Sequence, residues 1–359
     1  MLDQRLISGG EQRDFQPAFF EIPSADCGSM HNDGGMDDPG EGEDAGLQEL
    51  DQRDIMAKKE KGMEMGVYQD IIARKPIEKG WSGDRKYCAT TADGSKYLLR
   101  LSPLEKHDRR KREFDKMCEV AALAIPMAQP VEFGVCAEGV YTIERFIEGV
   151  DAEEYIPGLP AENQYSYGLD AGRILAKLHT IHAPADAPAW GPHFHAKIDR
   201  NIAMYEACLL KYENAKPFLT YIEENRHLLA DRPQSYQHGD YHVGNMMVDK
   251  QGKLTVIDFD RDDFGDPWEE FNRIVWCAHT APAFASGMVD GYFDGQVPVE
   301  FWKLLALYIC SNTLSSLPWA IPFGERELQI MRDQAAQILR WYDDMKNVVP
   351  AWYKSMYRR

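Results

Sequence analysis

The sequence predicts an α+β fold of two lobes, in which a small, mainly antiparallel sheet carrying one helix precedes a mainly helical lobe. Three observations predict this arrangement. A chain of 359 residues with 44% hydrophobic content can bury a large core and divide into two lobes. Residues 63–147 contain alternating polar and apolar segments typical of strands, and helical periodicity dominates beyond Gly149. We expect a smaller lobe over residues 63–147 and a helical lobe over residues 148–359.

The first 62 residues differ from the remainder in composition. Residues 1–60 hold 15 acidic and 5 basic side chains, together with many Gly and few large apolar residues. Such a segment buries too little apolar surface to offset the entropy of ordering. We expect residues 1–62 to be an acidic, disordered extension.

Each element of the smaller lobe has a local signal. The segment KYCATTADGSKYLLRLS alternates around Asp93-Gly94, which predicts a hairpin. A helix follows, in which Phe114, Met117, Cys118 and Ala121 recur at helical spacing before Pro126. The segments VEFGVC and GVYTIERFI are two further predicted strands. These elements make up the expected sheet and its helix.

The larger lobe is predicted from five segments with helical periodicity and one hairpin. The hairpin consists of the strands MMVD and LTVID, joined by the turn KQGK. The helical segments are YGLDAGRILAKLHTIH, NIAMYEACLLKYE, FLTYIEENRHLLA, EFWKLLALYICSNTLSSL and ELQIMRDQAAQILRWYDDMK.

Composition excludes several classes of partner. The net charge of −18 disfavours nucleic acid and anionic membranes and favours cations. The seven cysteines are scattered without a C-x-x-C pair, which argues against a disulfide framework or zinc ribbon and favours the cytoplasm. No contiguous apolar run approaches the roughly 18 residues that a membrane span needs, so we expect no span. Composition leaves the oligomeric state open.

The segment QHGDYHVGNMMVDKQGKLTVIDFD places polar side chains at one end of the predicted hairpin. Asp240 and Asn245 lie in the loop before its first strand, and Asp258 ends its second strand. These side chains should therefore converge. Carboxylate and amide oxygens suit a hard cation such as Mg²⁺, which completes its shell from water and phosphate oxygens. Phosphoryl transfer uses such an arrangement, with another acid accepting the proton of the incoming hydroxyl.

These residues resemble a known motif. His238-Gly239-Asp240 followed by Asn245, and then Ile257-Asp258-Phe259-Asp260, resembles the motif of the aminoglycoside phosphotransferase and choline kinase superfamily, which has a protein-kinase-like fold. The resemblance implies an ATP- or GTP-dependent kinase in which Asp240 is the catalytic base. It implies that Asn245 and Asp258 are the Mg²⁺ ligands. We expect His242 and Asp260 to contact phosphate or support the loop.

The resemblance also implies a nucleotide site in the smaller lobe. A glycine-containing loop would cover the phosphates, and a basic side chain on the next strand would pair with an acid on the helix. The superfamily usually has Lys on that strand, so Arg100, which we expect to pair with Glu113, is a departure. Backbone groups near the link between the lobes would meet the adenine. The other residues expected at this site are Gly80, Ser82, Gly83, Arg145 and Ile147.

The acceptor is less well defined than the reaction. We rank an aminoglycoside first, a cationic small molecule whose site would need carboxylates; the candidates are Glu148, Asp151, Asp262 and Asp263. A choline-like acceptor would instead need an aromatic cage. A macrolide, a sugar-like alcohol and a nucleotide-binding pseudokinase remain alternatives. The chain ends in the basic segment YKSMYRR, whereas aminoglycoside 3'-phosphotransferases have an acidic tail, and Glu270 stands where the superfamily commonly has Asp.

Overall fold

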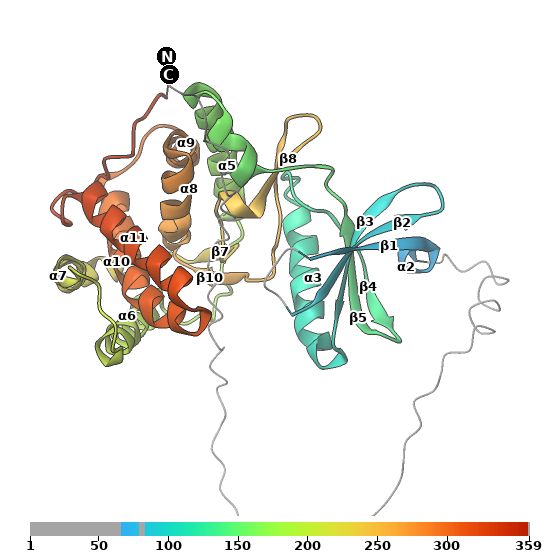
Figure 1. The fold of residues 1–359 in the computed structure, drawn as a ribbon, viewed down its shortest axis with the longest axis horizontal. Coiled ribbons are helices and arrows are strands. Elements are labelled where there is room, and N and C mark those ends of the chain that lie inside the picture. The colour runs from blue at the N-terminus through green and yellow to red at the C-terminus, as the bar shows by residue number, and fades with distance from the viewer. Residues whose placement is uncertain (1–65, 79–82, 358–359) are drawn as a thin grey trace, which may run out of the picture.

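The molecule has two lobes, a sheet with one long helix and a larger helical body (Figure 1). The structure, a computed structural model, describes residues 66–78 and 83–357. The expected disordered extension, residues 1–62, lies outside the described residues. The α+β class and the bilobal arrangement are confirmed.

The smaller lobe contains an antiparallel five-stranded sheet in the order β1-β2-β3-β5-β4. The predicted hairpin forms between β2 and β3, and Gly94 at its turn has a φ of 85°, which favours glycine. The first strand was not predicted, because five of its seven residues are exposed and show no alternation of burial. The strands are β1 (Ile71–Ile77), β2 (Arg85–Thr91), β3 (Lys96–Ser102), β4 (Pro130–Cys136) and β5 (Gly139–Arg145), and the short helix α2 (Val67–Asp70) precedes them.

The helix α3 (His107–Ala121) packs on β4 and β5. The predicted helix forms; Met117 on it is buried, whereas Cys118 is exposed. The buried face runs instead through Arg110, Met117 and Val120. A charged side chain therefore occupies a buried position of this helix, which hydrophobic periodicity alone does not reveal.

The helical lobe contains the five predicted helices and three others. The predicted segment NIAMYEACLLKYE is shifted, because its helix begins earlier and ends at Ala207. One of the unpredicted helices, Pro282–Phe293, is buried on nearly every side and therefore shows little amphipathic period, and another, Ile274–Thr280, has only seven residues. The helices are α4 (Ala152–Tyr155), α5 (Ala161–Leu178), α6 (Trp190–Ala207), α7 (Lys216–Asn225), α8 (Ile274–Thr280), α9 (Pro282–Phe293), α10 (Val299–Ala320) and α11 (Glu325–Tyr342).

Two of these helices are in backbone contact. A Cβ atom on Gly168 or Gly172 of α5 would lie 2.1 Å from the carbonyl oxygen of Phe284 or Met288, respectively, in α9. A Cβ on Gly287 or Gly291 of α9 would lie 2.2 Å from a carbonyl oxygen of α5. Residue numbers rise together along both helices at these contacts, so the helices run in the same direction. Reciprocal small-x-x-x-small pairs thus allow this close approach.

One helical stretch meets the length and hydropathy of a membrane span. The most apolar 18-residue window of the stretch Val299–Phe323 has a mean hydropathy of 1.3, and 78% of that window is buried inside the protein. Ser, Thr and Asn interrupt this stretch, so it is not a contiguous apolar run of the kind considered in the sequence. Its burial is that of a core helix.

Short strands and turns in the helical lobe position the loops that carry Asp240, Asn245 and Asp258. The sheet β6 (Gly149–Asp151), β8 (Met246–Asp249) and β9 (Leu254–Val256) contains the predicted hairpin, and β7 (Ser235–Gln237) pairs with β10 (Asp263–Gly265). Short 3-10 helices lie at Leu104–Lys106, Ile156–Gly158, Arg226–Leu229, Val243–Asn245, Glu269–Arg273 and Ile321–Phe323.

Candidate active site

The loop between β7 and β8 carries Asp240 and Asn245 and is held in one conformation by its backbone. Gly239 has a φ of 80°, and a Cβ there would lie 1.9 Å from the carbonyl oxygen of Arg261. Only glycine fits both constraints. This close approach brings the loop against the segment that follows Asp258.

The side chain of Glu270 holds the same loop in place through hydrogen bonds. Its carboxyl oxygen Oε1 accepts hydrogen bonds from the backbone N–H groups of Gly239 at 3.1 Å and Tyr241 at 3.4 Å. Burial raises the pKa of Glu270 to about 8, and the neighbouring Glu269 adds to that rise. The loop support expected from this position is thus provided by a buried glutamate.

His238 connects the two loops of the motif. Its Nε2 lies 2.9 Å from the carbonyl oxygen of Ile257, and its Nδ1 lies 3.3 Å from the backbone nitrogen of Asp240. Burial lowers the pKa of His238. A neutral ring with its proton on Nε2 satisfies both contacts, donating to Ile257 and accepting from Asp240.

Asp240 is a buried carboxylate with basic side chains close to it. The Nε atom of Arg273 lies 3.4 Å from its Oδ1, and the Nε2 atom of His242 lies 3.6 Å from the same oxygen. Burial would raise the pKa of Asp240, but His242, Arg273 and Arg261 outweigh it and hold that pKa well below its usual range. Asp240 therefore remains ionised near neutral pH.

A backbone hydrogen bond joins Asn245 to the segment that leads into Asp258. The backbone N–H of Ile257 donates to the carbonyl oxygen of Asn245 at 3.0 Å. The amide nitrogen of Asn245 donates to the backbone oxygen of Asp240 at 2.8 Å and to its Oδ2 at 3.1 Å, which leaves the amide oxygen as an acceptor. Asp258 has a φ of 66°, an uncommon conformation for a residue other than glycine and one enriched at functional sites.

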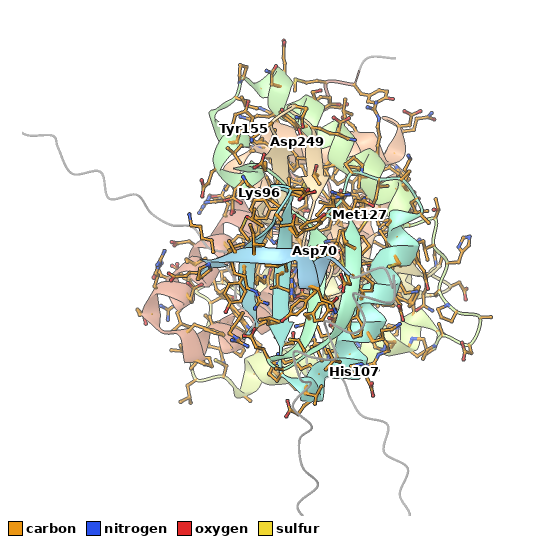
Figure 2. The ribbon with its side chains drawn as sticks, turned by 90° about the vertical axis from the view of Figure 1, so that its right-hand side faces the viewer. Asp70, Lys96, His107, Met127, Tyr155 and Asp249 are labelled. Carbon is orange, nitrogen blue, oxygen red and sulfur yellow. The ribbon has the colours of Figure 1, made fainter. Side chains whose placement is uncertain are left out.

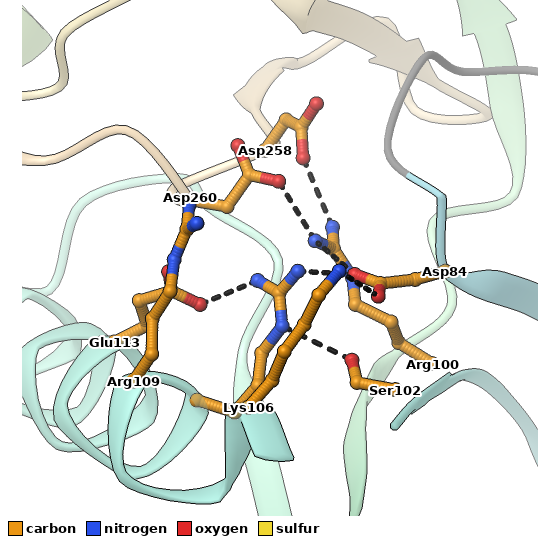
Figure 3. Close-up of polar contacts among 9 residues, drawn as sticks. Asp84, Arg100, Ser102, Lys106, Arg109, Glu113, Asp258 and Asp260 are labelled. Carbon is orange, nitrogen blue, oxygen red and sulfur yellow. Dashed lines mark hydrogen bonds and ion pairs between the residues drawn. The ribbon is translucent and has the colours of Figure 1, made fainter. Parts of the chain in front are cut away.

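Arg100 reaches from the sheet into this group of acids (Figure 3). Its Nη2 donates to Asp258 Oδ1 at 3.0 Å, and its Nη1 donates to Asp260 Oδ2 at 2.8 Å. Burial would lower the pKa of Arg100, but Asp260 and Asp258 raise it, so the side chain stays charged. Burial would raise the pKa of Asp258, yet Arg100 and Lys86 hold it below its ordinary value.

The prediction of an ion pair between Arg100 and Glu113 was wrong. Glu113 instead accepts from Arg109 at 2.8 Å and from Arg110, both on its own helix. Arg110 also donates to Asp84, and Asp84 Oδ2 lies 4.0 Å from Nη1 of Arg100. Two further charged residues therefore stand between the strand and the helix, and the sequence motif did not indicate them.

The remaining nucleotide-site predictions are only partly within the described residues. Gly80 and Ser82 lie outside them, while Gly83 is exposed, and a Cβ atom added there would meet no atom within 4 Å. The backbone N–H of Arg145 donates to the carbonyl oxygen of Gln129 at 2.8 Å, and Ile147 is half-buried two residues later. The N–H of Arg145 is thus engaged within the sheet lobe.

The four predicted acceptor carboxylates lie in two separate places. Glu148 binds Lys96 and also Lys250, the latter at 2.5 Å, and Asp151 pairs with Met247 in the β6–β8 ladder. Figure 2 shows Lys96 and Asp249 toward the same end of the molecule, opposite His107. Asp263 begins β10, where it pairs with Gln237 just before the loop that carries Asp240, and Asp262 precedes it. Burial raises the pKa of Asp262 to about 7, and Glu113 adds to this rise.

Sequence reasoning missed Arg273, whose Nε lies 3.4 Å from the carboxylate of Asp240. It ends the segment GDPWEEFNR, in which only Glu270 drew notice. A basic residue at the end of a short 3-10 helix carries no motif, so only the folded chain shows its place.

The donor atoms fit a hard divalent cation. Asn245 and Asp258 offer an amide oxygen and a carboxylate, the ligand types that Mg²⁺ prefers. In residues 66–78 and 83–357, no three His, Cys, Asp or Glu side chains are grouped to hold a metal ion. Two protein ligands are compatible with an ion that takes its other ligands from phosphate and water.

Comparisons with known proteins identify a family and similar folds. Residues 73–302 match the model of the phosphotransferase enzyme family. The fold resembles wild-type aminoglycoside 2'-phosphotransferase-IIIa in complex with GDP, at a TM-score of 0.57 and 13% identity, covering 84% of this chain and 100% of that chain. It resembles a choline/ethanolamine kinase family protein from Mesorhizobium loti, at a TM-score of 0.56 and 15% identity, covering 82% and 97%.

A third similar structure is a ternary complex. It is a thermostable mutant of aminoglycoside phosphotransferase APH(4)-Ia with ADP and hygromycin B, at a TM-score of 0.55 and 17% identity, covering 80% of this chain and 97% of that chain. A search of curated proteins found no match.

Proposed function

The chain belongs to the phosphotransferase enzyme family, and from this premise we propose that it transfers the γ-phosphoryl group of ATP to a hydroxyl group of a small molecule. One observation carries the proposal. The buried carboxylate of Asp240 is tied through the amide of Asn245 to the segment that bears Asp258. These contacts support the proposal that a proton acceptor lies beside a pair of oxygen ligands, which is the arrangement phosphoryl transfer requires.

Each residue has a proposed role in this reaction. Asp240 accepts the proton of the acceptor hydroxyl and orients that hydroxyl toward the γ-phosphorus. A carboxylate whose pKa is held low is a weak base, which suits a loose transition state that needs little charge on the nucleophile. Asn245 and Asp258 would hold Mg²⁺, which would neutralise charge on the phosphate oxygens. Arg100 is placed to contact the phosphates from the sheet side.

An aminoglycoside is the acceptor that we propose first. Two of the similar structures described above are aminoglycoside phosphotransferases, and Asp262 and Asp263 place carboxylates close to the catalytic loop. A choline-like alcohol is the second candidate, supported by the similarity to a choline/ethanolamine kinase family protein. Both are organic cations, consistent with the acidic composition of the chain.

The test is a screen for acceptor-dependent release of ADP. The purified chain is incubated with ATP and Mg²⁺ and with aminoglycosides, choline, macrolides or sugar-like alcohols. We expect turnover with at least one acceptor, abolished by EDTA and restored by Mg²⁺. Turnover on a non-aminoglycoside alone would replace the acceptor and keep the reaction. Activity that persists at full rate in EDTA would refute the proposed mechanism.

A further inference from the structure

A row of side chains with alternating charge connects α3 to the acids of the candidate active site (Figure 3). It begins at Glu113 of α3 and continues through Arg110, Asp84 and Arg100. Arg100 then contacts Asp258 and Asp260 in the other lobe. The row therefore crosses from the helix of the smaller lobe to the proposed metal ligand.

Asp84 is at the centre of this row. Its carboxylate contacts Arg110, lies 3.1 Å from the Nζ atom of Lys106 and lies 4.0 Å from Nη1 of Arg100. Burial would raise the pKa of Asp84, but Arg110 and Lys106 hold it below its usual value. The Asp84 side chain is fully buried, at 0% exposure, so the charge is satisfied by these cations rather than by water.

Arg110 is fixed from three directions. Its Nε donates to Ser102 Oγ at 3.0 Å, and its two Nη atoms donate to Glu113 and Asp84. Its side chain is 5% exposed and that of Arg100 is 7% exposed. Removing one member of a buried charged row leaves its neighbours unpaired, so the members should act as a unit.

Arg100 has donor capacity beyond its contacts with acids. Within residues 66–78 and 83–357, its buried Nε atom has no hydrogen-bond acceptor. Its two Nη atoms meet Asp258 and Asp260, one of which is a proposed ligand of Mg²⁺. The orientation of this guanidinium group therefore determines which donors face an incoming phosphate.

We propose that Asp84 and Arg110 are positioning residues for the nucleotide, which together align Arg100 against α3 in place of a direct pair between Arg100 and Glu113. This inference rests on the proposed function, because Arg100 is the group that would contact phosphate. Neither positioning residue needs to contact the nucleotide. The pair acts through the direction in which it holds the guanidinium group of Arg100.

The test measures nucleotide binding by titration calorimetry, which requires no knowledge of the acceptor. ADP with Mg²⁺ is titrated into the full chain and into D84N, R110Q and the double variant D84N/R110Q. We expect each single change to raise Kd about tenfold, and the double change to add less than about twofold, because the two residues form one coupled unit.

The matched control is K111Q, which removes an exposed pair with Asp115 on the same helix. Its Kd should equal that of the unchanged chain. R110K serves as a second probe, since it keeps the charge but cannot reach Ser102, Glu113 and Asp84 together, and its Kd should also rise. Melting temperatures of all variants identify any that fail to fold; if R110Q fails, R110K and D84N provide the comparison.

The outcomes separate this inference from the proposed function. If the unchanged chain binds ADP and D84N and R110K bind it equally well, the inference is wrong and the proposed function stands. Full additivity in the double variant would also refute the coupling. If the unchanged chain binds no nucleotide, the proposed function fails and the inference fails with it. Once an acceptor is known, the KM for ATP should rise in D84N while the KM for the acceptor stays the same.

Discussion

Asp240 is the residue on which the proposed chemistry depends most directly. We expect D240N to lower kcat by about 10² to 10⁴, because the amide cannot accept the proton of the hydroxyl. The amide keeps the shape of the side chain, so the Kd for ADP with Mg²⁺ should change little. Steady-state kinetics and calorimetry check the two parts. A kcat within about twofold of the unchanged chain would exclude Asp240 as the base.

Glu270 gives a prediction for the dependence of stability on pH. Its pKa is raised by burial from 4.5 to about 8, so the folded chain binds a proton that the unfolded chain has released between these values. The free energy of unfolding therefore falls as pH rises from about 4.5 to about 8, and the loss is complete above that window. E270Q carries a neutral group at every pH and should lack this loss.

The measurement is the free energy of unfolding of both chains from pH 5 to pH 9. The difference between them isolates Glu270 from Glu144 and Asp262, whose pKa values burial also raises to about 7. We expect E270Q to gain stability relative to the unchanged chain as pH rises. Parallel profiles for the two chains would show that Glu270 is ionised throughout.

At the residue scale, the sequence predicted the motif but not its surroundings. Asp240, Asn245 and Asp258 could be placed because their spacing around a hairpin is a local property of the chain. Arg273, Arg110 and Asp84 could not be placed, because each reaches its partner only through tertiary packing. A charged residue on an amphipathic helix is ordinarily exposed, so the burial of Arg110 had no signal in the periodicity.

At the element scale, the packing of α5 against α9 supports the loop between β7 and β8, which carries Asp240. The carbonyl oxygen of Ala171 in α5 accepts a hydrogen bond from the hydroxyl of Tyr241 at 2.7 Å. Tyr241 is the residue after Asp240. A change in the spacing of α5 and α9 would therefore be transmitted to Asp240, the candidate base, through the side chain of Tyr241.

We expect G287A to destabilise the fold. Its Cβ would lie 2.2 Å from the carbonyl oxygen of Tyr165, and neither helix backbone can yield without disturbing the rest of the interface. Overpacking of this kind costs about 1–3 kcal/mol. Urea unfolding measures the change. G158A is the matched control, since a Cβ there meets no atom within 4 Å, and it should unfold like the unchanged chain.

A fall in stability for G287A no larger than that for G158A would show that the two helices separate without cost. The sequence contains both glycine pairs, G-x-x-x-G in α5 and in α9, but this pattern is too common to predict a particular partner. Helix α9 itself was not predicted, because its burial on nearly every side removes the amphipathic period.

At the scale of the whole molecule, residues 353–355 return to α9 and bury a carboxylate. Asp290 accepts hydrogen bonds from the hydroxyl groups of Tyr353 and Ser355, each at 2.6 Å, and from Tyr165. Asp290 has no exposed surface, so these hydroxyl groups replace its hydration. The segment near residue 355 is thus fixed to the helical lobe through a buried carboxylate.

We expect Y353F to lower the free energy of unfolding by about 1.5–3 kcal/mol, because it removes a hydrogen bond to a buried charge. Thermal or chemical unfolding measures this loss. The control is Y155F, at a tyrosine that is 41% exposed, and it should have little effect. A loss in Y353F equal to that in Y155F would mean that water substitutes for the tyrosine hydroxyl.

The division into a sheet lobe and a helical lobe was predictable because it depends on periodicity summed over long segments. The lengths of the helices and the join between the lobes were less predictable. Both depend on contacts between residues far apart in the chain, such as Glu148 with Lys96 and Lys250. Those contacts also engage one of the carboxylates that we expected to receive a cationic acceptor.

The ion pairs of Arg100 with Asp258 and Asp260 affect how the two lobes move relative to each other. Because Arg100 lies on β3 of the smaller lobe, these ion pairs join the two lobes, and we expect them to hold the lobes close together without nucleotide. Scattering curves recorded with and without nucleotide should then give nearly equal radii of gyration. R100A removes these ion pairs, so the radius of gyration of the nucleotide-free protein should increase. Addition of nucleotide should then decrease it.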